Sequence, residues 1–255
     1  MEVVKAIKDW AATKPPNFDI PRLNRAAFHD AADYNKWTGQ GGPDGNLVMG
    51  QEAFYGQSHG LPMMVKSSLS QFKKQFGEAL SWADLLQIAG MVATEIAGGP
   101  KFEEYGFEPG RIDNPTSASL DGLLPNAGDL ANMNTNRDFW FRAGFDDHEI
   151  VASMGAHTLG GSVTGDFTST PDDFNNQYFK NLLKFEEPDC CARTLEGGFT
   201  QLPTDRALLT DPTTRKLVEL YASDQTAWFA DYVKAIRKMS LFGRDTSVKW
   251  CGVEK

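Results

Sequence analysis

Residues 151–161 read VASMGAHTLGG and contain the histidine on which the interpretation of the chain depends. His157 ends an apolar run and is followed by Thr158 and a pair of glycines. An imidazole can bind a metal through one ring nitrogen while a hydrogen-bonding partner orients the other nitrogen. A lone histidine at the end of an apolar helix can equally be a core residue whose hydrogen bonds are satisfied. The stretch therefore predicts either a metal ligand or a core histidine.

Arg25 and His29 lie four residues apart in the segment RAAFHD. On a helix this spacing puts both side chains on one face, one turn apart. A permanently charged arginine beside a histidine that can cycle its proton suits the heterolysis of a peroxide. The histidine would move a proton between the two oxygens, and the arginine would stabilise charge on the departing one. The alternative is an ion-pairing arginine and a surface histidine without a catalytic role.

Length and composition narrow the class of protein. A chain of 255 residues with 41% hydrophobic residues can bury a large core as one or two lobes. The net charge of −9 argues against a nucleic-acid partner, because phosphate binding needs a basic face. We find no apolar run long enough for a membrane span, and residues 1–10 read as an amphipathic helix rather than a signal peptide.

The cysteines indicate the redox compartment. Cys190, Cys191 and Cys251 form neither a disulfide framework nor a zinc-binding spacing. This usage is typical of a reducing compartment. We therefore expect an intracellular protein, in the cytosol or, if a targeting segment has been removed, in an organelle.

Helical periodicity dominates the chain and predicts a mainly α-helical protein. The expected helices cover residues 4–12, 21–34, 62–76, 81–97, 137–141, 146–154, 174–185 and 213–241. Ser81 is a good N-cap, with Asp84 three residues later as a variant of the capping box. Residues 101–129 are loop-like and are expected to cross between two lobes of a single domain, about 1–115 and 116–255. No stretch alternates for long enough to predict a strand.

Taken together, the two histidine motifs resemble those of the plant-type haem peroxidases, the superfamily of ascorbate peroxidase, cytochrome c peroxidase and the fungal ligninolytic enzymes. GAHTLG resembles the proximal-histidine motif, and RAAFHDA resembles the distal motif, with Phe28 stacked between the two catalytic residues. GGPDGN, SWADLLQIAG, GGP and PGRID match further segments, and LPTDRALLTDP and DQTAWFADYVKAI look very like ascorbate peroxidase. The resemblance implies a two-lobed helical fold with haem b between a distal and a proximal lobe.

The resemblance also implies roles for individual residues. Arg25 and His29 would act on the peroxide, and His157 would bind the haem iron. Asp205 would accept the Nδ1 proton of His157 and make that imidazole a stronger donor to the metal. An aspartate in the first turn of a helix after Pro203 is the alternative reading of Asp205.

Three positions depart from the closest branch of this superfamily. Phe28 and Phe167 stand where ascorbate and cytochrome c peroxidases carry a distal and a proximal tryptophan; the secreted enzymes also have a distal phenylalanine. Ser58 falls where family members use asparagine to orient the distal histidine, and its hydroxyl can accept the same N–H. The chain therefore resembles the class I enzymes overall, with distal features of the fungal class II enzymes.

Two cation sites are implied by the same resemblance. Asp30, Gly42, Asp44 and Asn46 resemble the distal calcium ligands of the secreted enzymes. The alternative for these residues is a solvent-exposed acidic loop. The candidate ligands on the proximal side are Thr158, Thr168, Thr170, Asp173 and Asn175. Their low charge would favour K⁺ or another monovalent cation, or no ion.

The implied activity is reduction of hydrogen peroxide to water with one-electron oxidation of a donor. The ascorbate enzymes anchor their substrate with two basic residues, but Asn17 falls at the first position and residues 162–166 contain no arginine. We therefore expect a small phenol or similar reductant to be favoured over ascorbate. An ascorbate-type or a cytochrome c-type donor is the alternative. A haem-free structural or binding homologue is a rival of another class, although such a protein would not need all four of Arg25, His29, His157 and Asp205.

Overall fold

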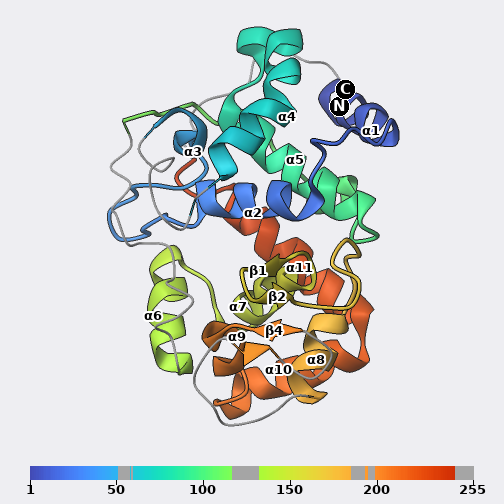
Figure 1. Ribbon diagram of the computed structural model, residues 1–255. Coiled ribbons are helices and arrows are strands. Elements are labelled where there is room, and N and C mark those ends of the chain that lie inside the picture. Colours follow the sequence, from blue (N-terminus) through green and yellow to red (C-terminus); the bar gives the residue numbers. More distant parts are fainter. Residues whose placement is uncertain (51–57, 59, 117–131, 185–192, 195–198, 245–255) are drawn as a thin grey trace. The chain divides into compact units, whose positions relative to one another are not determined.

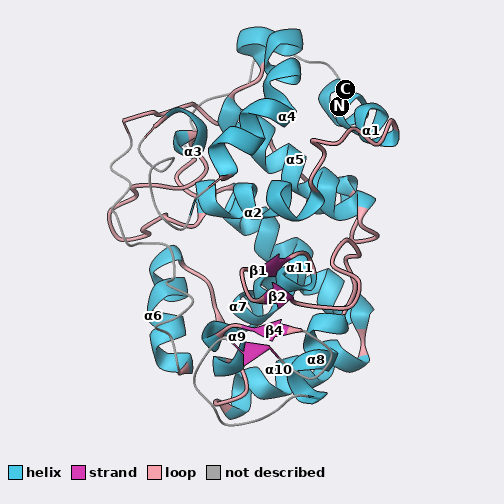
Figure 2. Ribbon diagram, in the orientation of Figure 1, coloured by secondary structure: helices cyan, strands magenta, loops and turns pink. Residues whose placement is uncertain are grey.

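The computed structural model of the protein describes residues 1–50, 58, 60–116, 132–184, 193–194 and 199–244. The three cysteines lie outside these ranges, so the compartment inferred from them stays a prediction. Within the described ranges the protein is mainly α-helical (Figure 2), as its periodicity predicts. No helix in these ranges is long and apolar enough to cross a membrane.

Most of the helices lie close to their predicted ranges. They are α1 (Glu2–Ala12), α2 (Ile20–Ala31), α3 (Asn46–Met49), α4 (Leu61–Phe76), α5 (Trp82–Ile96), α6 (Met133–Ala143), α7 (Asp147–Met154), α8 (Gln177–Lys184), α9 (Pro203–Ala207), α10 (Pro212–Ser223) and α11 (Gln225–Ser240). Short 3₁₀ turns occur at η3 (Gly77–Ala79), η4 (Phe102–Tyr105) and η5 (Gly155–Thr158). Two antiparallel hairpins pair β1 (Gly161–Ser162) with β2 (Gly165–Asp166), and β3 (Arg193–Thr194) with β4 (Thr200–Gln201).

The prediction of a single helix over residues 213–241 is wrong, because α10 and α11 are separate helices. The break falls at Asp224, whose carboxylate accepts the backbone N–H groups of Thr226 and Ala227 at 2.9 and 3.0 Å. An aspartate in this position satisfies the unpaired donors at the start of a new helix. One helix therefore ends and the next begins here without a glycine or a proline.

The chain divides into two compact units. Unit 1 consists of Met1–Ile96, Lys101–Leu124 and Arg237–Lys255, and unit 2 of Ala97–Pro100 and Pro125–Ile236. The expected division into lobes of about 1–115 and 116–255 stays a prediction. The end of α11 belongs to unit 1.

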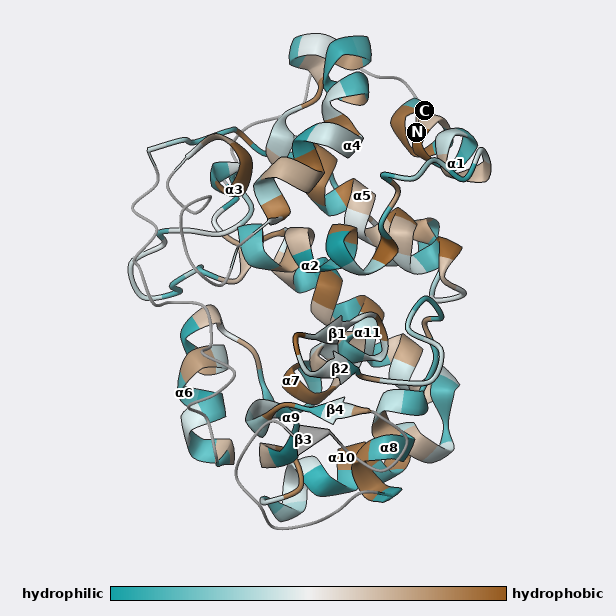
Figure 3. Cartoon of the chain, viewed as in Figure 1, coloured by the Kyte–Doolittle hydropathy of each residue, from teal (hydrophilic) through white to brown (hydrophobic). Residues whose placement is uncertain are grey.

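The core of unit 1 is built around α5, which packs against α1, α2 and α4 (Figure 1). Hydrophobic residues, brown in Figure 3, recur along α4 and α5. The crossing of α2 and α5 is close, since a Cβ atom at Gly90 would lie only 2.6 Å from the Cβ of Ala27. Asp19 caps the start of α2 by accepting the N–H of Arg22 at 2.9 Å. This packing holds α2, and with it the RAAFHD motif, in one orientation within unit 1.

The start of α5 combines the expected cap with an unexpected ion pair. Ser81 Oγ accepts the N–H of Asp84 at 3.0 Å, as predicted. The carboxylate of Asp84 does not complete a capping box: it accepts the Gly110 N–H at 2.7 Å and contacts Arg111 Nη1 at 2.8 Å. Arg111 also donates to the carbonyl of Ser240 from two of its nitrogens. This guanidinium therefore joins α5, the segment after η4 and the end of α11 within unit 1.

The core of unit 2 is aromatic. Trp228 of α11 is fully buried and stacks on Phe174 at a centroid distance of 4.7 Å. Its indole N–H donates to the carbonyl of Ala152 in α7 at 2.9 Å. A Cβ atom at Gly155 would lie 2.6 Å from the indole and 2.7 Å from Phe179, so only glycine fits where α7 ends. This contact fixes the backbone two residues before His157.

Candidate active site

His157 lies in η5, directly after α7. Asp146 caps α7 through a complete capping box with Glu149, in which each side chain accepts the other's backbone N–H at 2.9 Å. The helix gives way at Gly155 to the 3₁₀ turn that contains the histidine. The His157 side chain is 37% exposed, so it is not the fully buried core histidine that the sequence allowed.

Asp205 is the hydrogen-bonding partner of His157. Its carboxylate is fully buried in α9, and Oδ1 lies 2.7 Å from His157 Nδ1. Oδ2 accepts the N–H of Leu202 at 2.8 Å, so the residue also caps its own helix. A carboxylate at this distance fixes the proton on Nδ1 and leaves the lone pair of the imidazole on Nε2. Among the described residues, Nε2 of His157 has no hydrogen-bond partner, so it is available to a metal.

Two further aromatic side chains complete the surroundings of His157. Phe167 stacks on the imidazole, with centroids 4.9 Å apart and an interplanar angle of 16°. Tyr178 meets the imidazole edge-on, and its hydroxyl donates to Asp205 Oδ1 at 3.0 Å. Burial raises the pKa of Tyr178 well above its ordinary value, and the Asp205 charge adds to this, so the phenol keeps its proton. No sequence motif predicts this contact, because Tyr178 and Asp205 are 27 residues apart.

In unit 1, Arg25 and His29 meet on one face of α2 as their spacing predicts. Arg25 Nε donates to His29 Nε2 at 3.1 Å, and His29 Nδ1 lies 3.2 Å from Ser58 Oγ. Because Nε2 accepts a hydrogen bond, a neutral His29 carries its proton on Nδ1 and donates it to Ser58. Phe28 meets His29 edge-to-face, at 5.8 Å and 77°, rather than stacking on it. Nε2 is thus the basic nitrogen of His29.

Comparison with known proteins shows the family to which the chain belongs. The model of the family described as peroxidase matches residues 2–224. The chain belongs to the peroxidase family. Probable L-ascorbate peroxidase 3, peroxisomal, of Oryza sativa subsp. japonica is 37% identical over 249 residues, or 95% of this chain and 79% of the rice protein. L-ascorbate peroxidase 2, cytosolic, of Arabidopsis thaliana is 39% identical over 229 residues, or 88% of this chain and 84% of the relative.

This peroxidase is a member of the plant-type haem peroxidase superfamily, of the class I type that includes the ascorbate peroxidases. It is an oxidoreductase that acts on a peroxide, and membership of the family implies haem. The mainly α-helical fold agrees with this assignment. The resemblance inferred from the two histidine motifs is therefore confirmed.

The residues expected to bind calcium form a hydrogen-bonded loop in unit 1 of the peroxidase. Asp30 is fully buried, and its two oxygens accept the N–H groups of Gly45 and Leu47, each at 3.2 Å. Burial and the charge of Asp44 raise the pKa of Asp30 well above its ordinary value. In the described part of the chain no group of three or more His, Cys, Asp and Glu could hold a metal ion. The calcium ligand set therefore stays a prediction.

Two other members of this set have identifiable neighbours. Gly42 has φ +94°, and a Cβ atom there would lie 2.9 Å from the carbonyl oxygen of Phe242. Its N–H donates to Asp33 at 2.7 Å. Asn46 donates its N–H to Asp44 at 3.1 Å. Backbone packing is therefore sufficient to explain a glycine at position 42.

On the proximal side the candidate cation ligands gather in unit 2. Thr168 Oγ1 donates to the carbonyl of Thr158 at 3.0 Å, and Asn175 Nδ2 donates to Thr170 Oγ1 at 3.1 Å. Thr158 Oγ1 donates to Asn175 Oδ1 at 3.4 Å. Asp173 joins the group through its backbone N–H, which donates to the Thr170 carbonyl. The peroxidase thus brings these five residues together, and potassium binding by them stays a prediction.

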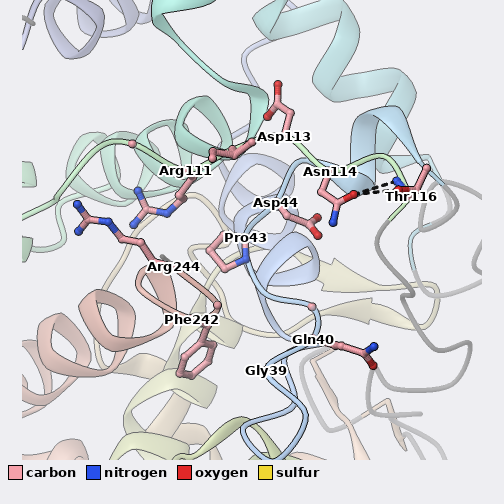
Figure 4. A pocket seen from close by; sticks show the side chains of 14 residues that line it. Gly39, Gln40, Pro43, Asp44, Arg111, Asp113, Asn114, Thr116, Phe242 and Arg244 are labelled. Carbon is pink, nitrogen blue, oxygen red and sulfur yellow. Dashed lines mark hydrogen bonds between the residues drawn. The ribbon is translucent and has the colours of Figure 1, made fainter. Parts of the chain in front are cut away.

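A cavity of about 690 Å³ lies in unit 1 of the peroxidase (Figure 4). Its walls come from the segments 39–44, 110–116 and 242–244. Arg111 contacts Asp84, and Arg244 contacts Glu108. Asp113 accepts two backbone N–H groups at the start of α5, at 2.9 and 3.0 Å. Arg111, Arg244 and Asp113 therefore each have an ion-pair or hydrogen-bond partner within unit 1, and these interactions stabilise the fold around the cavity.

Proposed function

We propose that this enzyme is a haem b peroxidase in which His157 binds the iron and His29 acts on hydrogen peroxide. The observation that carries the proposal is the 2.7 Å contact between His157 Nδ1 and the buried carboxylate of Asp205. A neutral imidazole whose Nδ1 proton is held by a carboxylate is the donor that haem iron uses in many proteins. The donor chemistry of this half-site therefore fits haem. Retention of this pair together with Arg25 argues against a haem-free binding protein.

The chain contributes acid–base chemistry and charge stabilisation. When bound, haem supplies the electron transfers that peroxide reduction and one-electron oxidation of a donor require. His29 Nε2 would take a proton from one peroxide oxygen and deliver it to the departing oxygen. Ser58 holds the tautomer that leaves Nε2 basic. Arg25, whose Nε lies 3.1 Å from Nε2, would stabilise negative charge on the departing oxygen.

For the electron donor we propose ascorbate. Similarity to the proteins named L-ascorbate peroxidase supports this donor, and it does not support the preference for phenols expected from the sequence. A small phenol is the second candidate, because both expected anchoring positions lack a basic side chain. Asn17 donates to the carbonyl of Ser67 at 2.8 Å, and the β1–β2 turn presents Val163 and Thr164. Ascorbate would then need an anchor elsewhere on the chain.

The same similarities support a proposal for the setting of the reaction. Hydrogen peroxide and a small-molecule donor are the proposed partners. The net charge of −9 is the argument against a nucleic-acid partner. The relatives are named as cytosolic or peroxisomal proteins, which supports an intracellular, reducing compartment for this chain.

Haem binding tests the central assignment. The parent protein should bind one haem per chain and show a Soret band, and His157→Ala should lose stable haem or its activity, because the proposed iron ligand is removed. His148→Ala is the matched control: it removes an exposed imidazole at the start of α7 and should leave the spectrum unchanged. An unchanged Soret band and unchanged turnover in His157→Ala would contradict the ligand assignment.

Steady-state assays with ascorbate and guaiacol test the donor. Saturable turnover of ascorbate that exceeds the turnover of guaiacol would support ascorbate. Faster guaiacol turnover, with no saturation by ascorbate, would support the phenol instead and would leave the haem assignment intact.

A further inference from the structure

The hydroxyl of Tyr178 shares one oxygen of Asp205 with the imidazole of His157. Tyr178 donates to Oδ1 at 3.0 Å, and His157 Nδ1 lies 2.7 Å from the same oxygen. Asp205 is 0% exposed and Tyr178 is 3% exposed, so bulk water does not compete for these bonds. Two donors therefore draw on the electron density of a single carboxylate oxygen.

The other neighbours of His157 do not provide this interaction. Phe167 stacks on the imidazole and has no polar side-chain atom. Leu202 donates a backbone N–H to the other oxygen, Oδ2, at 2.8 Å. Among the described side chains, Tyr178 is thus the one donor to Asp205 besides His157.

We propose that Tyr178 is a positioning residue that limits how strongly Asp205 draws on the Nδ1 proton of His157, and so sets the donor strength of His157 toward iron. This inference rests on the proposed function, in which His157 is the axial ligand. A carboxylate that already accepts a hydrogen bond is a weaker acceptor for the next donor. By its hydrogen bond to Asp205, the Tyr178 hydroxyl therefore reduces the negative charge that Asp205 would otherwise induce on the imidazole of His157.

Removing the Tyr178 hydroxyl should shift the reduction potential of the iron in one direction only. In Tyr178→Phe, Oδ1 keeps only the His157 donor, so the hydrogen bond between Asp205 and Nδ1 strengthens. The imidazole becomes more anionic, and Nε2 becomes a stronger donor. A stronger axial donor stabilises the ferric state, so the Fe(III)/Fe(II) reduction potential should become more negative.

Two kinds of measurement test the proposal. The first is the ¹H NMR shift of the His157 Nδ1 proton in the protein without haem, which needs neither activity nor cofactor. The second is the iron–histidine stretching frequency of the ferrous haem protein, by resonance Raman, together with its reduction potential. Tyr178→Phe should move the proton resonance downfield, raise the stretching frequency and lower the potential.

Tyr221→Phe is the matched control. It removes another buried tyrosine hydroxyl of unit 2, which donates to the Asp231 carboxylate at 2.9 Å. This variant should lose stability as Tyr178→Phe does, but the three readouts should not move. A purely structural role for Tyr178 would leave them unmoved in both variants, and that result would overturn the proposal.

A second substitution keeps the test decisive if Tyr178→Phe folds poorly. Replacing Tyr178 by 3-fluorotyrosine keeps the ring and makes the hydroxyl a stronger donor, so all three shifts should reverse in sign. Shifts in the same direction as for Tyr178→Phe would overturn the proposal. A parent protein that binds no haem would overturn the proposed function. The role of Tyr178 toward Asp205 would then be tested by the Nδ1 proton shift of His157 alone, and no shift in Tyr178→Phe would overturn it.

Discussion

His29 has different neighbours at its two ring nitrogens, and this difference decides what the side chain can do. Nδ1 is held by Ser58 at 3.2 Å, whereas Nε2 faces the guanidinium of Arg25 at 3.1 Å. Because Nε2 accepts the Arg25 N–H, the proton of the neutral imidazole sits on Nδ1 and the lone pair on Nε2. A general base must be deprotonated before it can accept a proton from substrate, so the pair is prepared for the first step with peroxide.

Replacing this base should slow the reaction with peroxide and leave haem binding intact. We expect His29→Leu to lower the second-order rate constant roughly 10²–10⁴-fold, the usual contribution of a positioned acid–base group. Stopped-flow absorbance after mixing with hydrogen peroxide measures this rate. His148→Leu, at an exposed position of α7, should react at the parental rate. A rate for His29→Leu within a few-fold of the parent would show that another group is the base.

At this scale the sequence predicts one half of the site better than the other. Arg25 and His29 are four residues apart on one helix, so their meeting is a local property of the chain. His157 and Asp205 are 48 residues apart, and only the family resemblance linked them. Tyr178 was not predicted because its bond to Asp205 depends on how α8 and α9 pack, which has no signature in either segment.

At the level of elements, the junction between α7 and η5 is sterically restricted. Gly155 has an ordinary helical backbone, with φ −55°, so any cost of substitution there arises from packing. A methyl group would lie 2.6 Å from the Trp228 indole. We therefore expect Gly155→Ala to destabilise the protein by about 1–3 kcal/mol, the usual cost of overpacking a core.

A double-mutant cycle with Trp228→Leu measures this effect by urea unfolding. In the Trp228→Leu background the space beside position 155 is larger, so Gly155→Ala should cost less than it does alone. Equal costs in both backgrounds would show that the indole is not the obstacle.

The start of α10 gives a pH-dependent prediction. Asp211 caps this helix, and its hydrogen bond with Arg137 at 2.9 Å holds the pKa of the carboxyl below its ordinary value. An aspartate whose pKa is lowered by folding contributes stability above its unfolded pKa, near 3.9, and loses it as the pH falls through the folded pKa. Asp211→Asn keeps a good N-cap and removes the charge. We expect a loss of roughly 1 kcal/mol at pH 7, since the pair is partly exposed.

Urea unfolding at several pH values tests this prediction. The difference in the free energy of unfolding between the parent and Asp211→Asn should become smaller as the pH falls below about 4. In an Arg137→Met background the same substitution should cost little at any pH. A difference that does not change with pH would mean that the ion pair with Arg137 does not contribute.

Periodicity predicts the long helices well and their interruptions poorly. The apolar spacing of residues 81–97 was sufficient for α5, because one strongly apolar helix can be recognised without knowing its partners. The break at Asp224 was missed, since the apolar pattern continues across it and the capping hydrogen bonds are invisible in composition. The β1–β2 hairpin was missed because each strand has only two residues, too few for alternation to be detected.

On the scale of the whole molecule, one buried ion pair joins distant parts of the sequence. Arg111 and Asp84 are 2% and 4% exposed, and Arg111 also binds the carbonyl of Ser240, 129 residues later. Arg111→Met keeps much of the volume but leaves the Asp84 carboxylate buried without its cation. We expect a loss of about 3–5 kcal/mol in the free energy of unfolding, the usual cost of breaking a buried pair.

The control for this prediction is Arg237→Met, which removes a surface ion pair with Glu108 whose side chains are 52% and 47% exposed. This change should cost no more than about 1 kcal/mol. Urea unfolding curves of both variants provide the comparison. Similar losses in the two variants would show that burial of the Arg111 pair does not matter for stability.

The bond between Arg111 and Ser240 also has a consequence for the order in which the protein can fold on the ribosome. A ribosome adds about 5–20 residues per second, so the 129 residues between the two partners take roughly 6–26 s to synthesise. During this interval Arg111 cannot make this bond, because its carbonyl acceptor has not yet been synthesised. Unit 2 ends at Ile236, four residues before Ser240. Unit 1 can therefore be completed only after the whole of unit 2 has been translated.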